Sequence, residues 1–279
     1  MRYATIRLDG RVRWGRVEGD RLHPLDDVYP SLAAAIGAGA LGPALTSGAG
    51  QEAIPLASVE FLPLITAPGK ILCVGLNYEN HRKETGRAEV KNPTIFTRFA
   101  DSQTGHLQPI LLPSESTKLD YEGELAIVIG KGGRRIPASV AMEHVAGYSC
   151  YNDGSIRDWQ AHTIQFTPGK NFPNTGAFGP WLVTPDEFGA PGQQRLQTRL
   201  NGAVMQSAVL ADMIFPIERL IEYCSAFTPL SPGDVIVTGT PGGVGAKRDP
   251  QVFMKPGDRV EVEIEGIGIL ENTIAEEPA

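Results

Sequence analysis

Two glutamates stand two residues apart where a buried strand is expected to begin. They are Glu122 and Glu124 in Asp120-Tyr-Glu-Gly-Glu-Leu-Ala-Ile-Val-Ile-Gly130, a segment that is wholly apolar after Glu124. Alternate residues of a strand point to the same face, so the two carboxylates are predicted to lie side by side. Neighbouring like charges are destabilising unless a cation lies between them. Asp120 is expected to stay in solvent.

A third carboxylate, Asp153, ends the next expected strand, in Tyr148-Ser-Cys-Tyr-Asn-Asp-Gly-Ser155. Two glutamates and an aspartate form an oxygen-only ligand set, which suits Mg²⁺ or Mn²⁺. A solvated strand start at Glu122 and Glu124, with Asp153 as a helix cap, fits the same spacing. Spacing alone therefore leaves the metal site open.

His81 has a carboxylate at helical spacing. The segment from Asn77 to Glu84 is predicted to be a short helix with Asn77 as its N-cap and Gly86 as its stop. His81 and Glu84 then share a face, and a carboxylate that orients an imidazole is the arrangement that activates water. Because the segment is polar all round, we expect a lid that orders over substrate. An exposed helical ion pair fits the same residues.

Other signatures narrow the class of protein. The sequence has no GxSxG, HExxH or GxxxxGK[ST] motif, and its five histidines include no i, i+4 pair. Its three separated cysteines predict buried thiols in a reducing compartment. A net charge of -7 disfavours nucleic acid and anionic membranes as partners. With no signal peptide and no apolar run of roughly 18 residues, a cytoplasmic protein is expected.

The elements that must position these residues are mostly strands. Alternation predicts a hairpin of Tyr3–Leu8 and Val12–Val17, with Asp9-Gly10 as its turn. Further strands are predicted over Ile71–Val74, Leu125–Ile129, Val145–Tyr151, Gly179–Val183, Asp234–Thr238 and Arg259–Ile264.

Helices and connections are fewer. The clearest helix is Pro216–Phe227, which has one apolar stripe, and a shorter one is expected over Ser31–Ile36. An Ala/Gly-rich passage, Gly37–Gly50, predicts a flexible connection. We place a domain boundary near Ala67, which separates a small N-terminal β-rich domain (1–67) from a catalytic domain (68–279).

With these residues in view, the chain resembles the fumarylacetoacetate hydrolase superfamily, whose smaller members include acylpyruvate hydrolases and oxaloacetate decarboxylases. The resemblance runs from about Ile71 to Ile274. It rests on Cys73-Val-Gly-Leu-Asn-Tyr-Glu-Asn-His81, Asp120-Tyr-Glu-Gly-Glu-Leu125, Ala146-Gly-Tyr148, Asn152-Asp153, Arg157-Asp-Trp-Gln160, Gly169-Lys170 and Asp234-Val-Ile-Val-Thr-Gly-Thr-Pro-Gly-Gly-Val-Gly245. It implies an α+β, predominantly β fold with a multilayered β catalytic domain, and a homodimer.

The resemblance also implies roles for individual residues. These are the metal ligands Glu122, Glu124 and Asp153, the catalytic residues His81, Glu84, Lys170 and Gln160, and the substrate contacts Thr240, Arg98 and Tyr78. The glycines at 239, 242 and 243 would let backbone N–H groups approach an anion. Where many small members have Lys-Pro, this chain has Arg98-Phe99, and Phe99 is expected to reshape the pocket wall.

The activity that these roles imply is metal-dependent hydrolysis of the C–C bond of an acylpyruvate (a 2,4-dioxo acid) to pyruvate and a carboxylic acid, as in aromatic catabolism. The partner would be a small anionic 2-oxo acid. Two alternatives stay open: an oxaloacetate decarboxylase or 2-oxo acid keto–enol isomerase/hydratase of the same fold, and a non-catalytic metal-dependent binding protein. An apolar wall at Phe99 predicts that an acylpyruvate is preferred over oxaloacetate.

Overall fold

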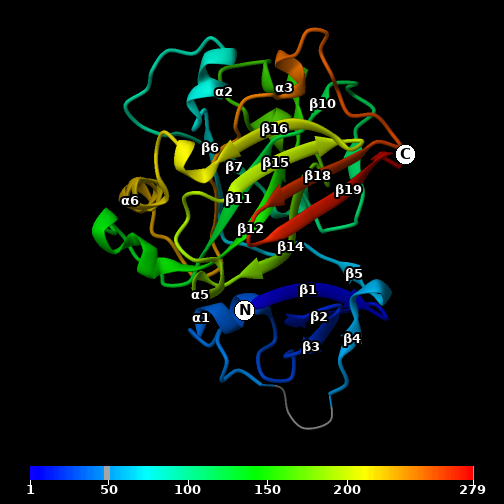
Figure 1. The fold of residues 1–279 in the computed structure, drawn as a ribbon, viewed down its shortest axis with the longest axis vertical. Helices are drawn as coiled ribbons and strands as arrows, with labels where there is room; N and C mark the ends of the chain where they lie inside the picture. The colour runs from blue at the N-terminus through cyan, green and yellow to red at the C-terminus, as the bar shows by residue number, and fades with distance from the viewer. Residues whose placement is uncertain (47–50, 279) are drawn as a thin grey trace.

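Strands predominate in the fold, which is of the α+β class (Figure 1). The structure, a computed structural model, describes residues 1–46 and 51–278 of the 279-residue chain, so the end of the expected Gly37–Gly50 connection lies outside the described residues. One large mixed sheet has the order β4 (Ile54–Pro55), β3 (Arg21–Pro24), β2 (Arg11–Glu18), β1 (Arg2–Leu8), β14 (Gly176–Val183), β12 (Val145–Asp153), β11 (Gly123–Ile129), β17 (Val235–Val237), β6 (Ile71–Gly75) and β7 (Thr94–Arg98). In addition, β5 (Glu60–Phe61) pairs with β1, and β8 (Gln103–Thr104) pairs with β14.

The N-terminal strands continue this sheet. Asp9 and Gly10 have φ values of 49° and 75°, as a two-residue hairpin turn requires, and β1 then pairs with β14 of the following part of the chain. Ser31 caps α1 (Leu32–Gly37) by accepting a hydrogen bond from the amide of Ala34. The hairpin and helix are confirmed, and the division at Ala67 stays a prediction.

A second sheet packs against the first and encloses the main hydrophobic core. Its order is β16 (Ala203–Val209), β15 (Arg195–Leu200), β18 (Arg259–Ile264), β19 (Gly268–Glu276) and β9 (Ile110–Leu112). In β18 the predicted alternation is confirmed, because Val260, Val262 and Ile264 are buried. In Figure 1 these strands lie across β11, β12 and β14.

The helices lie outside the sheets. The predicted apolar helix is α6 (Ile217–Phe227), which buries Ile217, Leu220, Ile221 and Cys224. The remaining elements are α2 (Glu79–Glu84), α3 (Arg157–Gln160), α4 (Thr167–Lys170), α5 (Pro185–Phe188), the 3₁₀ turns η1 (Leu56–Ser58), η2 (Ala100–Ser102), η3 (Ala138–His144), η4 (Leu210–Asp212) and η5 (Gly245–Lys247), and a small ladder of β10 (Leu119–Asp120) and β13 (Ser155–Ile156). Among the described residues, no helix combines the length and apolar character that crossing a membrane requires.

Strand register brings the predicted acidic residues together. In the antiparallel pair of β11 and β12, Gly123 lies opposite Asn152, and the amide of Asp153 donates to the carbonyl of Glu122 at 2.8 Å. On its other side β11 pairs with β17, after which the chain enters the glycine-rich turn at Gly239. Residues from three separate segments therefore meet at one end of the central strands.

Two short helices are held close together beside this end of the sheet. A side chain at Gly169 in α4 would come within 2.6 Å of the Cα and Cβ atoms of Gln160 in α3. Only a residue without a Cβ permits this approach. Gly169 thus fixes the relative position of Gln160 and its own neighbour Lys170.

Gly169→Ala should lower the free energy of unfolding by about 1–3 kcal/mol, because the added methyl group forces α3 and α4 apart. Gly192→Ala is the matched control, since a Cβ at Gly192 meets no atom within 4 Å, and its effect should stay within about 0.5 kcal/mol. Urea denaturation of both variants measures the difference. Equal stability of the two would show that the contact of α3 with α4 is not tight.

Candidate active site

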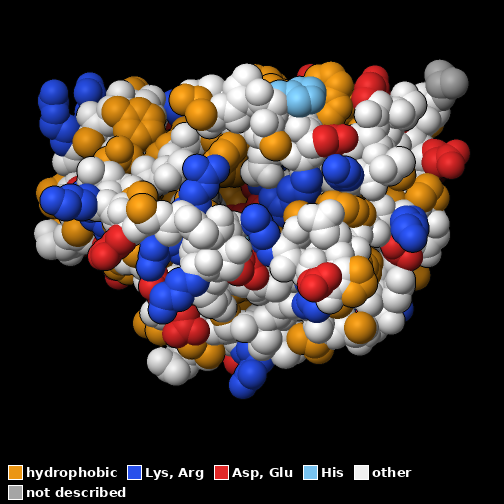
Figure 2. Space-filling model, turned by 90° about the horizontal axis from the view of Figure 1, so that it is seen from above, with side chains coloured by type: hydrophobic (Ala, Val, Ile, Leu, Met, Phe, Trp, Pro, Cys, Tyr) orange, Lys and Arg blue, Asp and Glu red, His pale blue; other side chains and the backbone are white. Residues whose placement is uncertain are grey.

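Three buried carboxylates form the centre of the site. Glu122, Glu124 and Asp153 each offer an oxygen, and these oxygens lie within 4.8 Å of one another. Glu122 and Glu124 line a pocket of about 490 Å³, and Figure 2 shows a hollow whose rim carries Lys and Arg side chains. A buried all-oxygen donor set of this kind could hold a divalent metal ion.

Buried cations neutralise most of this negative charge. Lys170, itself 1% exposed, bridges Glu122 Oε2 and Asp153 Oδ2, at 2.6 Å from each. The second oxygen of Glu122 accepts from Arg157 at 2.6 Å, and that of Asp153 accepts from Arg98 at 2.6 Å. Burial alone would raise the pKa of Glu122, but Lys170 and Arg157 outweigh it and hold that pKa at about 2. Charged groups are tolerated in the interior only when they are paired in this way.

Glu124 lacks such a partner. Its Oε2 accepts only the backbone N–H of Gly239, and no ion pair involves it among the described residues. Burial, followed by the nearby charges of Asp153 and Glu122, raises its pKa well above the usual range of a glutamate. One carboxylate of the cluster is therefore left without a cation. The cluster fits a divalent ion, which would supply the missing positive charge.

Asp120 also belongs to this network, so the prediction that it stays in solvent is wrong. It is fully buried. Its Oδ2 accepts from Arg157 Nε at 2.8 Å, and its carboxylate also accepts the amides of Gly245 and Ala246 at 2.8 and 2.9 Å. Asp120 thereby ties the glycine-rich turn to the arginine that holds Glu122.

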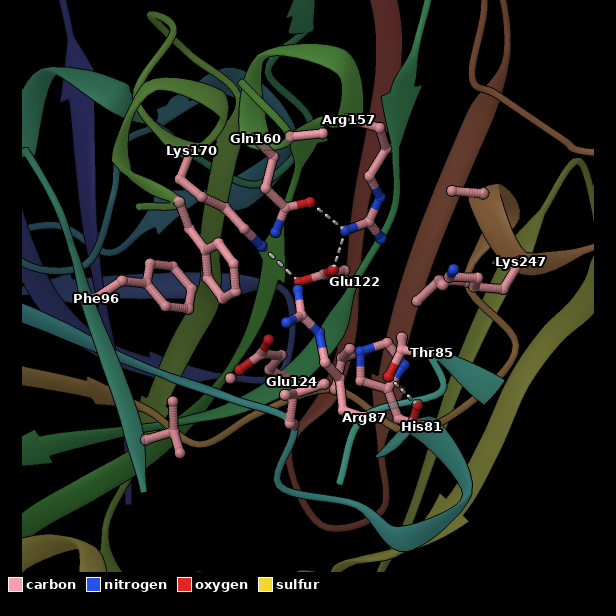
Figure 3. A pocket seen from close by; sticks show the side chains of 18 of the residues that line it. His81, Thr85, Arg87, Phe96, Glu122, Glu124, Arg157, Gln160, Lys170 and Lys247 are labelled. Carbon is pink, nitrogen blue, oxygen red and sulfur yellow. Dashed lines mark hydrogen bonds and ion pairs between the residues drawn. The ribbon is translucent and has the colours of Figure 1, made fainter. Parts of the chain in front are cut away.

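The His81 and Glu84 side chains contact each other beside the cluster. His81 Nδ1 lies 2.7 Å from Glu84 Oε1, and His81 lines the pocket (Figure 3). Burial opposes ionisation of Glu84, but the bonds from His81 and from the amide of Gly243 lower its pKa. With Nδ1 held by the carboxylate, Nε2 is left to exchange protons with a bound molecule.

The α2 helix that carries this pair is fastened to the glycine-rich turn. Glu84 Oε2 accepts from the amide of Gly243 at 2.9 Å, and Asn80 Oδ1 accepts from that of Gly242 at 3.1 Å. The amides of Gly239, Gly242 and Gly243 thus donate to side chains of the protein itself. The prediction that these amides bind an anion is therefore wrong. Asn77 is not the N-cap, because its side chain instead bonds the backbone of Phe215 and Thr238.

The other predicted catalytic and binding residues divide into two groups. Gln160, Lys170 and Thr240 line the pocket with His81, Glu122 and Glu124. Gln160 Oε1 accepts from Arg157 at 2.9 Å, and Thr240 Oγ1 donates to the carbonyl of Gly123 at 3.0 Å. Arg98 and Tyr78 do not line the pocket.

Arg98 and Tyr78 are both buried outside the pocket, and their role as substrate contacts stays a prediction. Arg98 is 2% exposed, and its guanidinium forms an ion pair with Asp153 and donates hydrogen bonds to Gly154 and Thr175. Tyr78 is fully buried, and burial raises its pKa. Phe99, the expected pocket wall, is 55% exposed and also lies outside the pocket.

The sequence interpretation missed several pocket residues. The aromatic wall is made by Phe96 and Phe166, and Lys170 Nζ lies 5.0 Å from the centroid of the Phe96 ring. Arg87 and Lys247 also line the pocket. The alternation of side chains on β7 could have indicated Phe96, because it lies two residues before the inward Arg98.

Comparison with known proteins supports the same assignment of fold. Residues 70–275 match the family described as fumarylacetoacetate (FAA) hydrolase C-terminal, and residues 1–63 match the family described as Rv2993c-like, N-terminal. The mitochondrial oxaloacetate tautomerase FAHD2A of Bos taurus is 45% identical over 223 residues, which are 79% of this chain and 71% of that protein.

Two solved structures share the fold over nearly the whole chain. Fumarylacetoacetate hydrolase from Exiguobacterium antarcticum is 34% identical with a TM-score of 0.88 and covers 99% of this chain and 100% of its own. A 5-carboxymethyl-2-hydroxymuconate delta-isomerase from Mycobacterium smegmatis is 33% identical with a TM-score of 0.82 and has the same coverage. The family match, the identity with these relatives and the shared fold show that the chain belongs to the fumarylacetoacetate hydrolase superfamily, whose members are enzymes.

Proposed function

We propose that the protein interconverts the keto and enol forms of oxaloacetate with the help of Mg²⁺ or Mn²⁺. The observation that carries the proposal is that His81, held by Glu84, lines the same pocket as Glu122 and Glu124 of the carboxylate cluster. An oriented imidazole beside a cation site provides a proton acceptor where negative charge must be stabilised. The 45% identity with an oxaloacetate tautomerase supports the same reaction.

Glu122, Glu124 and Asp153 would hold the metal ion. When bound, Mg²⁺ or Mn²⁺ supplies positive charge that stabilises the enolate of a 2-oxo acid. The oxygen-only donor set supports these ions over Zn²⁺, for which nitrogen and sulfur ligands are usual.

The chain's own residues supply the proton transfer. Glu84 holds Nδ1 of His81, so Nε2 can accept a proton from C3 of the substrate and return it to the oxygen on the adjacent C2. Lys170 adds positive charge near the carboxylate cluster, and Gln160 presents its amide to the pocket. The Phe96 and Phe166 rings exclude water from one wall.

Hydrolysis of an acylpyruvate is the second candidate, because the same pair could deprotonate a water molecule. The predicted preference for an acylpyruvate has lost its basis, since Phe99 lies outside the pocket. A non-catalytic binding role does not account for the oriented histidine. A homodimer, a cytoplasmic location and a role in aromatic catabolism stay predictions.

Glu124→Gln should abolish Mn²⁺ binding while the fold is retained, because the amide replaces the only cluster carboxylate without a cationic partner. Glu115→Gln, at an exposed carboxylate, is the control and should bind Mn²⁺ like the unaltered protein. Titration calorimetry measures binding, and circular dichroism checks the fold. Unchanged Mn²⁺ affinity in Glu124→Gln, or full activity of the unaltered protein in excess chelator, would contradict the metal site.

His81→Ala should lower kcat for oxaloacetate tautomerisation by roughly 100- to 10,000-fold, the range lost with a general base, and should change KM little. His23→Ala, on the distant β3 strand, should leave both constants unchanged. The absorbance of the enol reports the reaction. An acylpyruvate is assayed in parallel at equal Mg²⁺, and if its cleavage is the faster reaction, hydrolysis replaces tautomerisation as the function.

A further inference from the structure

Two cationic side chains line the pocket without any protein partner. Arg87 and Lys247 are exposed pocket residues, and neither side chain forms an ion pair or hydrogen bond with the part of the chain that the structure describes. The other two pocket cations, Lys170 and Arg157, are both bound to carboxylates. In a protein with a net charge of -7, two unpaired cations in one pocket are positioned to receive an external anion.

The backbones of both residues are held in place, although their side chains are free. Arg87 directly follows the Gly86 turn, where its amide donates to the carbonyl of Arg82 and Arg82 Nη1 donates to the carbonyl of Arg87. Lys247 ends the η5 turn, which begins at the amides bound by Asp120. Ligand binding therefore orders only the ends of two side chains.

The two cations flank the proposed base. In Figure 3 Arg87 and Lys247 lie on either side of His81, while Phe96 and Lys170 lie across the pocket. Arg87 also belongs to the same short segment as His81 and Glu84. An anion bound to Arg87 would therefore affect the position of His81, the proposed base. The inner end of the pocket is suited to a metal-chelating 2-oxo acid, and the outer cations offer a second anion site.

We propose that Arg87 and Lys247 bind the distal carboxylate of the substrate and so select dicarboxylic acids. This inference rests on the proposed function, because the 2-oxo acid end is taken to lie at the carboxylate cluster. A substrate with a neutral distal end would leave both cations unused. Arg87 and Lys247 are thus specificity-determining residues, separate from the groups that transfer the proton.

The test compares two unreactive ligands that differ by one carboxylate, L-malate and L-lactate. Titration calorimetry in Mg²⁺ should show malate binding more tightly to the unaltered protein. Arg87→Gln and Lys247→Gln should each weaken malate binding roughly 10-fold, as expected for loss of one charge-assisted contact, and leave lactate binding unchanged. The matched control is Lys83→Gln, on the α2 helix that precedes Arg87, because Lys83 is 69% exposed at its side chain, pairs with Glu79 and does not line the pocket.

The possible outcomes separate this inference from the proposed function. Loss of malate selectivity in Arg87→Gln and Lys247→Gln, but not in Lys83→Gln, supports the inference even if oxaloacetate is not tautomerised. Equal effects on malate and lactate, or the same weakening in Lys83→Gln, overturn it. In that case the two residues are ordinary solvated charges, whatever reaction the enzyme catalyses.

Discussion

The balance of buried charge at one end of the central strands is the constraint on which the site depends. Four carboxylates and three cations share this region, and nearly all of them are closed off from solvent. An unpaired charge there is costly, so each cation holds both its carboxylate and the element that carries it. Lys170 joins α4 to the end of β12, and Arg157 joins α3 to β10. Short helices with little apolar surface are thus fixed by ion pairs.

The same balance of charge explains why a metal ion and an anionic substrate would bind at this end of the strands. The inner cations are all committed to carboxylates, yet Glu124 remains without one, which leaves the centre short of positive charge. A divalent ion corrects this deficit, and the corrected site attracts an anionic 2-oxo acid. The His81–Glu84 pair is held by the glycine-rich turn, and the same turn also binds Glu124 and Asp120, so the proton-transfer pair and the charge cluster are linked through its backbone amides.

Local patterns in the sequence predicted what depends on local spacing. In the structure Glu122 and Glu124 lie in one cluster, as their two-residue spacing predicts, and α6 buries an apolar stripe. The partners of those carboxylates come from distant segments without periodic patterns, so the resemblance was needed to indicate Lys170. Phe99 shows where a prediction failed, because neighbours near a strand end point to different sides: the side chain of Arg98 turns inward to Asp153, while that of Phe99 faces solvent.

The most direct measurement is a crystal structure determined with Mn²⁺, using anomalous scattering to locate the ion. The account predicts one ion in contact with Glu122, Glu124 and Asp153, with Lys170 withdrawn from at least one of the two carboxylates that it bridges. A structure in which Mn²⁺ binds elsewhere or not at all, while Lys170 still bridges Glu122 and Asp153, would contradict the claim that this cluster is a cation site.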